Sequence, residues 1–397
     1  MRKFSERLLS MEESATLAMS RKSRELKSQG LDIISLSLGE PDFDTPDFIK
    51  EAAVEAMEQN FTHYTPVAGY EDLRQAISDK FKRDNNLHYD TNQIVVSTGA
   101  KQSIANVMMC LVNPGDEVII PAPYWVSYIE IVKLAGGTPV IIETSMETDF
   151  KVSGKEVEKK ITDKTKAIIF SSPCNPTGSV YSKEELKDLA STLSKYKHIT
   201  IISDEIYEHI NFYGSHESIA QFEEVYDQTV TINGMSKAWA MTGWRIGYIG
   251  APKDIAEACD KMQGQFTSGT NSIAQKASIA ALKKDPAYLA DMIKAFEGRR
   301  KLVLDALKKM DGVKVNEPEG AFYFFPDISS FFGKSYNGKV IHNASGLCVF
   351  LLEEALVAVV TGEAFGDKNC IRISYATDEE TLKEAMNRVA MALKKLK

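Results

Sequence analysis

The chain lacks the features that mark membrane, secreted, disulfide-bonded or nucleotide-binding proteins. No apolar run approaches the ~20 residues that a membrane helix needs, and the first residues lack the apolar stretch of a signal peptide. The five cysteines are odd in number and form no CxxC pair, which predicts free thiols in a reducing cytoplasm. Neither Gly-x-Gly-x-x-Gly nor Gly-x-x-x-x-Gly-Lys-Ser/Thr occurs, so a nucleotide is not the expected ligand.

An excess of basic charge is also missing. The formal net charge is -8 and the pI is about 5.5, which argues against a nucleic acid as the main partner. What is present is an ordinary globular balance, with 44% apolar and 26% charged residues. A single core rarely grows beyond about 250–300 residues. The 397 residues therefore predict two domains.

Short apolar segments alternate with helix-like stretches through the middle of the chain. We predict strands at 93–97, 117–121, 166–171, 199–203, 229–233 and 245–249. Because these segments are apolar throughout, they indicate a mainly parallel sheet that helices cover on both faces. Shorter strand-like segments follow at 321–328, 357–360 and 370–375, and Thr377 with Glu380 is expected to cap a final helix.

These patterns predict an α/β fold with two domains. Residues 49–290 would form a large domain around the parallel sheet. Residues 1–48 and 291–397 would together form a smaller α+β domain. Ligands of parallel sheets bind outside the carboxyl ends of the strands, so polar residues that follow a predicted strand are candidates for a site.

Ser236 and Lys237 follow the predicted strand at 229–233, and Arg245 is eight residues after Lys237. A buried lysine beside cationic groups loses its proton easily and can form an imine with an aldehyde. Ser236 and Arg245 could hold a phosphate. The alternative is a surface lysine near a solvated arginine.

Asp204 and Tyr207 follow the predicted strand at 199–203. A carboxylate in this position can keep a pyridine nitrogen protonated, and Tyr207 could reach the 3-oxygen of such a ring. The alternative for Asp204 is an aspartate that stabilises a helix N-terminus.

Four further features could each belong to a ligand site or have an ordinary structural role. Asn175 offers an amide from a loop with two prolines, and Gly99-Ala100-Lys101 offers free N–H groups at a helix start. Trp125 could stack on a flat ring or simply pack in the core. Arg372 lies in an apolar segment and needs an anion, which is either a structural carboxylate or the carboxylate of a substrate.

The order and spacing of these residues resemble those of the class I pyridoxal-phosphate-dependent aminotransferases of fold type I. Leu38-Gly39-Glu40-Pro41-Asp42-Phe43 and Tyr64 also fit, and the resemblance covers essentially the whole chain. It is to the bacterial aspartate aminotransferases of subgroup Ib in particular, which include aspartate/prephenate aminotransferases. It implies a cytoplasmic homodimer that uses pyridoxal 5'-phosphate (PLP) and no metal to transfer the amino group of L-aspartate to 2-oxoglutarate, giving oxaloacetate and L-glutamate.

The resemblance also implies a role for each residue. Lys237 would carry PLP as an imine and later move the substrate's proton, while Asp204 would pair with the pyridine nitrogen. Tyr207 and Asn175 would bind the 3-oxygen, and Trp125 would stack on the ring. The residues implied to hold the phosphate are Gly99, Ala100, Lys101, Ser236, Arg245 and, reaching across from a second copy of the chain, Tyr64. The residues implied to surround the substrate's α-carboxylate are Arg372, Gly39 and Asn175, and Trp125 is implied to contact the substrate as well.

The distal carboxylate of a dicarboxylic substrate needs a separate group. In another subgroup an arginine of the partner subunit binds it, but residues 262–275 contain no arginine. The subgroup resembled here uses the lysine of a Gly-Ala-Lys-Gln segment and hydroxyls near the N-terminus, which implies Lys101, Ser14 and Thr16. The alternative is that Lys101 only helps to hold the phosphate.

Three other functions compete at this point. A β-lyase, or an aminotransferase for aromatic or apolar amino acids, would share the fold and the cofactor residues. A non-catalytic ligand-binding protein on this fold would be expected to lose Lys237 or Asp204, and both are present. A nicotinamide dehydrogenase would need the glycine fingerprint that the chain lacks.

Overall fold

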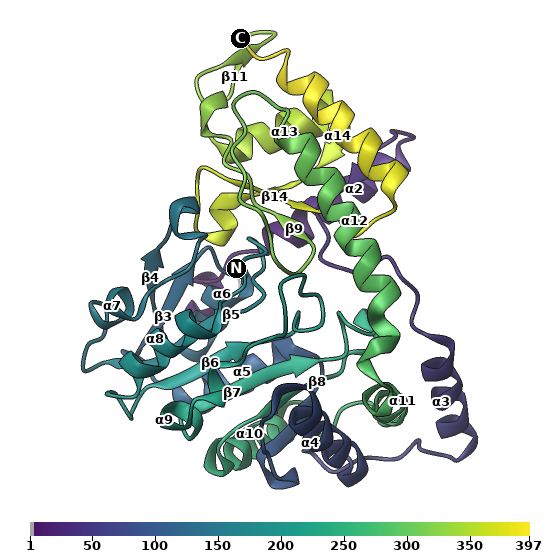
Figure 1. The fold of residues 1–397 in the computed structure, drawn as a ribbon, viewed down its shortest axis with the longest axis vertical. Coiled ribbons are helices and arrows are strands. Elements are labelled where there is room, and N and C mark those ends of the chain that lie inside the picture. Colours follow the sequence, from purple (N-terminus) through teal and green to yellow (C-terminus); the bar gives the residue numbers. More distant parts are fainter. Residues whose placement is uncertain (1–3) are drawn as a thin grey trace.

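A seven-stranded sheet forms the centre of the larger part of the molecule (Figure 1). The structure, a computed structural model, describes residues 4–397. The strand order is β2-β8-β7-β6-β5-β3-β4, and only β8 runs antiparallel to its neighbours. The strands are β2 (Ile94–Ser97), β3 (Glu117–Ala122), β4 (Thr138–Glu143), β5 (Thr165–Ser171), β6 (Thr200–Asp204), β7 (Thr229–Gly234) and β8 (Gly247–Gly250). The predicted, mainly parallel sheet is confirmed.

Successive residues of the central strands pack against opposite helical layers, as the two-residue period of a strand requires. In β5, Ile169 belongs to one buried cluster and Ile168 to another. The helices of the first layer are α5 (Ala100–Leu111), α6 (Ser127–Ala135) and α10 (Lys253–Phe266), and those of the second are α7 (Gly154–Glu158), α8 (Lys183–Leu193) and α9 (Glu223–Tyr226). A third cluster packs α3 (Asp47–Glu58), α4 (Glu71–Asn85) and α11 (Ser272–Lys283) near β2 and β8.

The smaller part combines both ends of the chain. Its three-stranded sheet has the order β13-β14-β9, and β1 pairs in parallel with β12, so Ile34 lies opposite Val357. The strands are β1 (Ile34–Ser35), β9 (Tyr323–Phe324), β10 (Ser335–Tyr336), β11 (Lys339–Val340), β12 (Val357–Ala358), β13 (Val360–Thr361) and β14 (Ile371–Ser374). The helices are α1 (Glu6–Leu9), α2 (Ala15–Ser28), α12 (Ala290–Leu307), α13 (Ala344–Glu354) and α14 (Glu379–Leu393).

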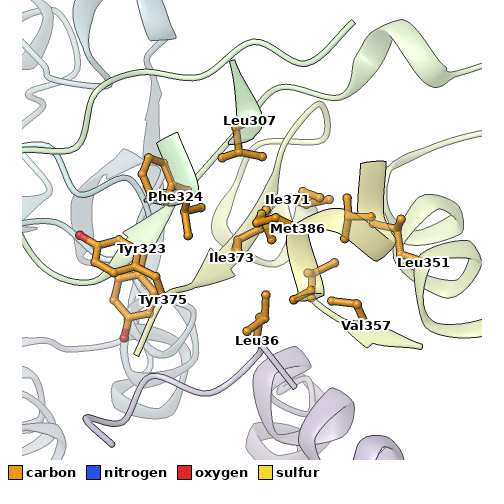
Figure 2. Packing of buried hydrophobic residues seen from close by; sticks show 14 of the residues in the cluster. Leu36, Leu307, Tyr323, Phe324, Leu351, Val357, Ile371, Ile373, Tyr375 and Met386 are labelled. Atoms are coloured by element: carbon orange, nitrogen blue, oxygen red, sulfur yellow. The ribbon is translucent and has the colours of Figure 1, made fainter. Parts of the chain in front are cut away.

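The core of this smaller part contains buried residues from the N-terminal segment, from its strands and from its helices. Figure 2 shows Leu36 from the N-terminal segment close to Ile373 of β14 and Val357 of β12. The long helix α12 runs from the region of α11 up to α13 and α14 (Figure 1), so the chain passes from one part to the other along a continuous helix. The division into residues 1–48, 49–290 and 291–397 stays a prediction.

Three local predictions differ from the structure. The segment predicted at 245–249 becomes a strand only from Gly247, because Arg245 adopts a left-handed backbone conformation with φ 58°. The cap of the last helix is Asp378, whose side chain accepts the amide N–H of Thr381, and not Thr377. The predicted strand at 321–328 is regular only at Tyr323–Phe324, since Ala321 has φ 55° and Pro326 offers no amide proton, and Asp327 forms only isolated bridges to Lys314 and Cys370.

Within residues 4–397, no helix combines the length and the apolar character that crossing a membrane would require.

The strand order brings several chain segments to one edge of the large sheet. Ser97 at the end of β2 and Gly234 at the end of β7 both lie opposite Gly247, the first residue of β8. Asp204 ends β6, the neighbour of β7. The polar residues that follow these strands therefore meet at the carboxyl edge of the sheet, facing the smaller part of the molecule.

Candidate active site

A cavity of about 430 Å³ opens at this edge. It is lined from both parts of the molecule, by the N-terminal segment, the strand ends of the large sheet, β9 and β14. The predicted site residues that line it are Ser14, Thr16, Gly39, Ala100, Lys101, Trp125, Asn175, Asp204, Tyr207, Ser236, Lys237, Arg245 and Arg372.

Two predicted residues do not line the cavity. Gly99 lies just outside it, and a Cβ atom added there would overlap the guanidinium group of Arg245. Glycine, with φ 82°, thus allows the arginine to approach the start of α5. Tyr64 lies elsewhere in the same chain, and its side chain is 99% exposed.

Lys237 follows β7 and turns its amine toward the cavity. The Nζ atom donates a hydrogen bond to the carbonyl oxygen of Gly39 and lies 5.6 Å from the ring centroid of Tyr207. The pKa of Lys237 is lowered to about 8, mainly by burial; the charge of Glu40 opposes this shift, and the charges of Arg372 and Arg245 add to it. This lysine is therefore partly neutral near physiological pH, as a nucleophilic amine must be.

Asp204 is buried at the end of β6, with its carboxylate on the side of α6. Its Oδ2 accepts a 2.6 Å hydrogen bond from the hydroxyl of Tyr128, and its Oδ1 accepts the amide N–H of Ile206 at 3.3 Å. Burial raises the pKa of Asp204 to about 6, which these two hydrogen bonds oppose. A buried carboxylate that lines a cavity is best stabilised by a cationic partner within that cavity.

An anion cradle lies where β8 passes the start of α5. A Cβ atom at Gly247 would overlap the backbone of Gly99 and Ala100, so glycine is required for this close approach. The guanidinium group of Arg245 donates to the carbonyl oxygen of Thr242 at 2.8 Å and keeps further N–H groups for another acceptor. Backbone N–H groups at the first turn of α5, the hydroxyl of Ser236 and this arginine form a donor set that suits a phosphate.

Arg372 is a buried cation on β14. Its Nη1 donates to Oδ1 of Asn175 at 3.0 Å, and its Nη2 donates to the carbonyl oxygen of Ser37 at 2.6 Å. Its Nε is buried and finds no hydrogen-bond partner among the described residues. No described carboxylate forms an ion pair with this guanidinium group, so the structural alternative weighed from the sequence is not observed among residues 4–397. A buried arginine in this state suits an anionic ligand.

The residues predicted for a distal carboxylate also line this cavity. Oγ1 of Thr16 is buried without a hydrogen-bond partner among the described residues, and Ser14 makes no side-chain bond as the N-cap of α2. Nζ of Lys101 lies 5.0 Å from the ring centroid of Trp125. Two free hydroxyls and an ammonium group thus border the same space.

Sequence reasoning did not assign a role to several polar residues that line the cavity. Among them are Tyr128, which bonds Asp204; Tyr323, whose hydroxyl lies 2.7 Å from that of Tyr207; and Glu40, which accepts a hydrogen bond from Thr242. Glu40 was recognisable within the Gly-Glu-Pro-Asp segment. The two tyrosines stand in apolar stretches, where the sequence predicts ordinary core residues.

A group of possible metal ligands lies outside the cavity. Glu205, Glu208 and His216 offer atoms within 4.8 Å of one another. Lys80 forms an ion pair with Glu208, and Nε2 of His216 lies 2.8 Å from Glu205. The charge of Glu205 raises the pKa of His216 against the opposing effect of burial. Lys80 and His216 thus already partner the two carboxylates, and we assign this network no metal.

Comparison with known proteins gives one family. The model for aminotransferases of class I and II matches residues 31–389. Among curated relatives, a bifunctional aspartate aminotransferase and glutamate/aspartate-prephenate aminotransferase of Petunia hybrida is 48% identical, over 99% of this chain and 83% of the relative. A probable aspartate/prephenate aminotransferase of Rhizobium leguminosarum bv. phaseoli is 49% identical, over 95% of each chain.

Solved structures with this fold include aspartate aminotransferases. The aspartate aminotransferase of Rhizobium meliloti is 41% identical and superposes with a TM-score of 0.97 over 100% of both chains. The aspartate aminotransferase of Thermus thermophilus with maleate is 41% identical and has a TM-score of 0.93, over 99% of this chain and 100% of that one.

Proposed function

The chain belongs to the aminotransferase class I and II family and is an aminotransferase, and on this premise we propose that it uses PLP to transfer the amino group of L-aspartate to 2-oxoglutarate. The products are oxaloacetate and L-glutamate. The observation that carries the proposal is the single cavity that brings a lysine of lowered pKa, a buried aspartate and a buried arginine together.

The residues of the cavity fit PLP, the cofactor that this family generally uses. The protonated pyridine nitrogen would be the cationic partner that buried Asp204 needs, and Tyr207 and Asn175 would bind the ring's 3-oxygen. Gly99, Ala100, Lys101, Ser236 and Arg245 would hold the phosphate at the start of α5. When bound, PLP supplies the electron sink that stabilises negative charge at the substrate's Cα.

The chain's own groups supply orientation and proton transfer. Lys237 would attach the cofactor and, once released from it, would move a proton to and from the substrate's Cα as general base and acid. A lysine with a pKa of about 8 suits both directions near neutral pH. The residues that hold the ring, the phosphate and the carboxylate would align one Cα bond for cleavage. This alignment removes much of the entropic cost of the step.

Substrate choice is proposed from the carboxylate-binding groups. Arg372 would bind the α-carboxylate that all amino acids share, and its unpaired Nε supports this role. Lys101, Ser14 and Thr16 would bind the second carboxylate of aspartate, glutamate and their oxo acids. The printed names of relatives, which include aspartate aminotransferase and aspartate/prephenate aminotransferase, support a dicarboxylic substrate and make prephenate a further candidate acceptor.

A homodimer with shared sites is part of the proposal. Tyr64 would reach the phosphate of the other subunit, and its 99% exposed side chain is free to do so. A second cavity behind Arg245, lined by Thr98, Trp244 and Thr270 among others, offers a place for the partner's tyrosine. A cytoplasmic location stays a prediction; all five cysteines are free thiols, as a reducing compartment would keep them.

An assay with defined substrates tests the function. Purified protein loaded with PLP and given aspartate and 2-oxoglutarate should form oxaloacetate and glutamate in equal amounts, without ammonia or pyruvate. Ammonia and pyruvate would instead indicate a lyase. Faster transfer from phenylalanine or alanine than from aspartate would reject the dicarboxylate proposal, and glutamate with prephenate tests the further acceptor.

A further inference from the structure

Tyr323 connects two groups that the proposed function uses separately. It belongs to β9, is fully buried and lines the cavity. Its hydroxyl lies 2.7 Å from the hydroxyl of Tyr207, which follows β6 in the large sheet. The face of its ring lies 4.6 Å from the guanidinium carbon of Arg372 on the neighbouring strand β14.

The surroundings of Tyr323 fix its hydroxyl in place. A Cβ atom at Gly39 would overlap this hydroxyl, so it occupies the space that glycine leaves open. The carbonyl oxygen of the same glycine accepts the hydrogen bond from Lys237. The ring centroid of Phe365 lies 4.8 Å from the guanidinium carbon of Arg372, so two aromatic rings pack near the arginine. Rotation of the Tyr323 side chain would therefore disturb these packed groups.

Both hydroxyls of the pair keep their protons. Burial raises the pKa of Tyr207 well above its usual value and raises that of Tyr323, while the charge of Arg372 partly opposes both shifts. Two protonated hydroxyls share one hydrogen bond, so one of the two protons remains available for another acceptor. If Tyr323 donates to the oxygen of Tyr207, the proton of Tyr207 is free to point into the cavity.

We propose that Tyr323 is a positioning residue for aminotransfer, which donates to Tyr207 and thereby orients and strengthens Tyr207 as the hydrogen-bond donor to the cofactor's 3-oxygen. The inference rests on the proposed function. A hydroxyl that accepts one hydrogen bond becomes a stronger donor in the next, because the two bonds polarise each other. Tyr323 itself acts only through Tyr207.

This role makes a prediction about the cofactor-loaded protein. The nitrogen joined to Lys237 can donate its proton to the negatively charged 3-oxygen. Once that proton is lost, the oxygen needs another hydrogen-bond donor, so a donor from the protein stabilises the deprotonated state. A weaker donor should therefore raise the pH midpoint at which the absorbance band of the lysine-bound cofactor changes. Losing the net stabilisation of one hydrogen bond corresponds to a shift of this midpoint by about half a pH unit to one unit.

The test is a pH titration of that band in five proteins: wild type, Tyr323→Phe, Tyr207→Phe, the double variant, and Tyr375→Phe as a matched control. Phenylalanine at 323 keeps the ring against Arg372 and removes only the hydroxyl. Tyr375 is also buried, but its hydroxyl donates to the carbonyl oxygen of Ala321 at 3.1 Å and it does not line the cavity. Figure 2 shows the hydroxyls of Tyr323 and Tyr375 pointing in different directions.

The midpoint should rise in Tyr323→Phe and rise further in Tyr207→Phe. The double variant should match Tyr207→Phe alone, because a residue that acts through another adds nothing once the other is gone. Tyr375→Phe should titrate like the wild type. A Tyr323→Phe midpoint equal to that of the wild type, or a shift that adds fully to that of Tyr207→Phe, would overturn the inference while leaving the proposed function intact. A wild-type protein with no lysine-dependent band would overturn both.

Discussion

The hydroxyl of Tyr128 donates a 2.6 Å hydrogen bond to Oδ2 of Asp204, and both side chains are buried. The bond joins α6 to the end of β6, so the carboxylate is held from the helical layer as well as from its own strand. Burial, and then the charge of Asp204, raise the pKa of Tyr128 well above its usual value, which keeps the tyrosine as the donor. Tyr128 thus favours the ionised form of an aspartate whose burial favours the neutral form.

Replacing Tyr128 by phenylalanine should weaken PLP binding. Without this donor the pKa of Asp204 should rise above about 6, so a larger fraction of the carboxyl is neutral and unable to pair with a cationic ring nitrogen. A hydrogen bond to a charged group contributes about 1.5–3 kcal/mol, which corresponds to a loss of affinity of roughly 10- to 100-fold. Titration of the apoprotein with PLP between pH 6 and 9, followed by absorbance, measures this, with Tyr124→Phe as a control outside the cavity. Equal affinities at every pH would contradict the role of Tyr128.

Replacing Arg372 by lysine should impair catalysis with every amino acid. Lysine keeps the positive charge but cannot reach Asn175, the carbonyl of Ser37 and a carboxylate together, as the planar guanidinium group can. A lost hydrogen bond to a charged group costs about 1.5–3 kcal/mol, so kcat/KM should fall by roughly 10- to 100-fold for aspartate and alanine alike. Arg300→Lys is the matched control, because Arg300 bonds Pro318 and Glu317 away from the cavity. Unchanged kinetics in Arg372→Lys would remove the α-carboxylate assignment.

Replacing Lys101 by alanine should change substrate preference. If Lys101 binds the distal carboxylate, kcat/KM for aspartate should fall by about 10- to 100-fold while that for alanine stays nearly constant, since one charge-assisted hydrogen bond is lost. Steady-state kinetics with the two amino acids decide the point. Lys133→Ala on α6, where Lys133 pairs with Glu130, serves as the control for loss of a lysine. Equal losses for the two substrates would instead assign Lys101 to the phosphate cradle alone.

The attachment of PLP to the apoprotein should depend on pH through Lys237. Only the neutral amine attacks an aldehyde, so the rate of attachment should rise with pH and level off above about 8, the pKa to which burial lowers Lys237. The charge of Glu40 raises this pKa, so Glu40→Gln should move the midpoint to lower pH. Stopped-flow absorbance across pH 6–10 measures both. A midpoint near 10, as for an exposed lysine, would show that the amine is not buried as described.

The sequence was most informative at positions where the function requires a residue that the fold itself does not require. Asp204, Lys237 and Arg245 are charged residues next to apolar strands, and the parallel sheet predicts that residues after strand ends meet at one edge. The structure brings these residues to one cavity because β6, β7 and β8 are neighbours. The expected roles of the site residues remain predictions until they are tested as above.

Tyr128 and Tyr323 could not be found in the same way. Each is an aromatic residue within an apolar stretch, and core packing accounts for such a pattern without any further role. Their partners, Asp204 and Tyr207, are 76 and 116 residues away in sequence. The first contact forms only when α6 packs against β6, and the second only when β9 approaches the large sheet. The error at Thr377 is of a different kind: two adjacent residues could both cap α14, and the backbone selects Asp378.

The most direct test of the whole account is a visible absorbance spectrum of the purified protein loaded with PLP, compared with that of Lys237→Ala. The wild-type protein should show the band of a lysine-bound cofactor, which changes when aspartate is added. The variant should lack this band and transfer no amino groups. A variant that retains both the band and the activity would contradict the central claim that Lys237 joins the cofactor.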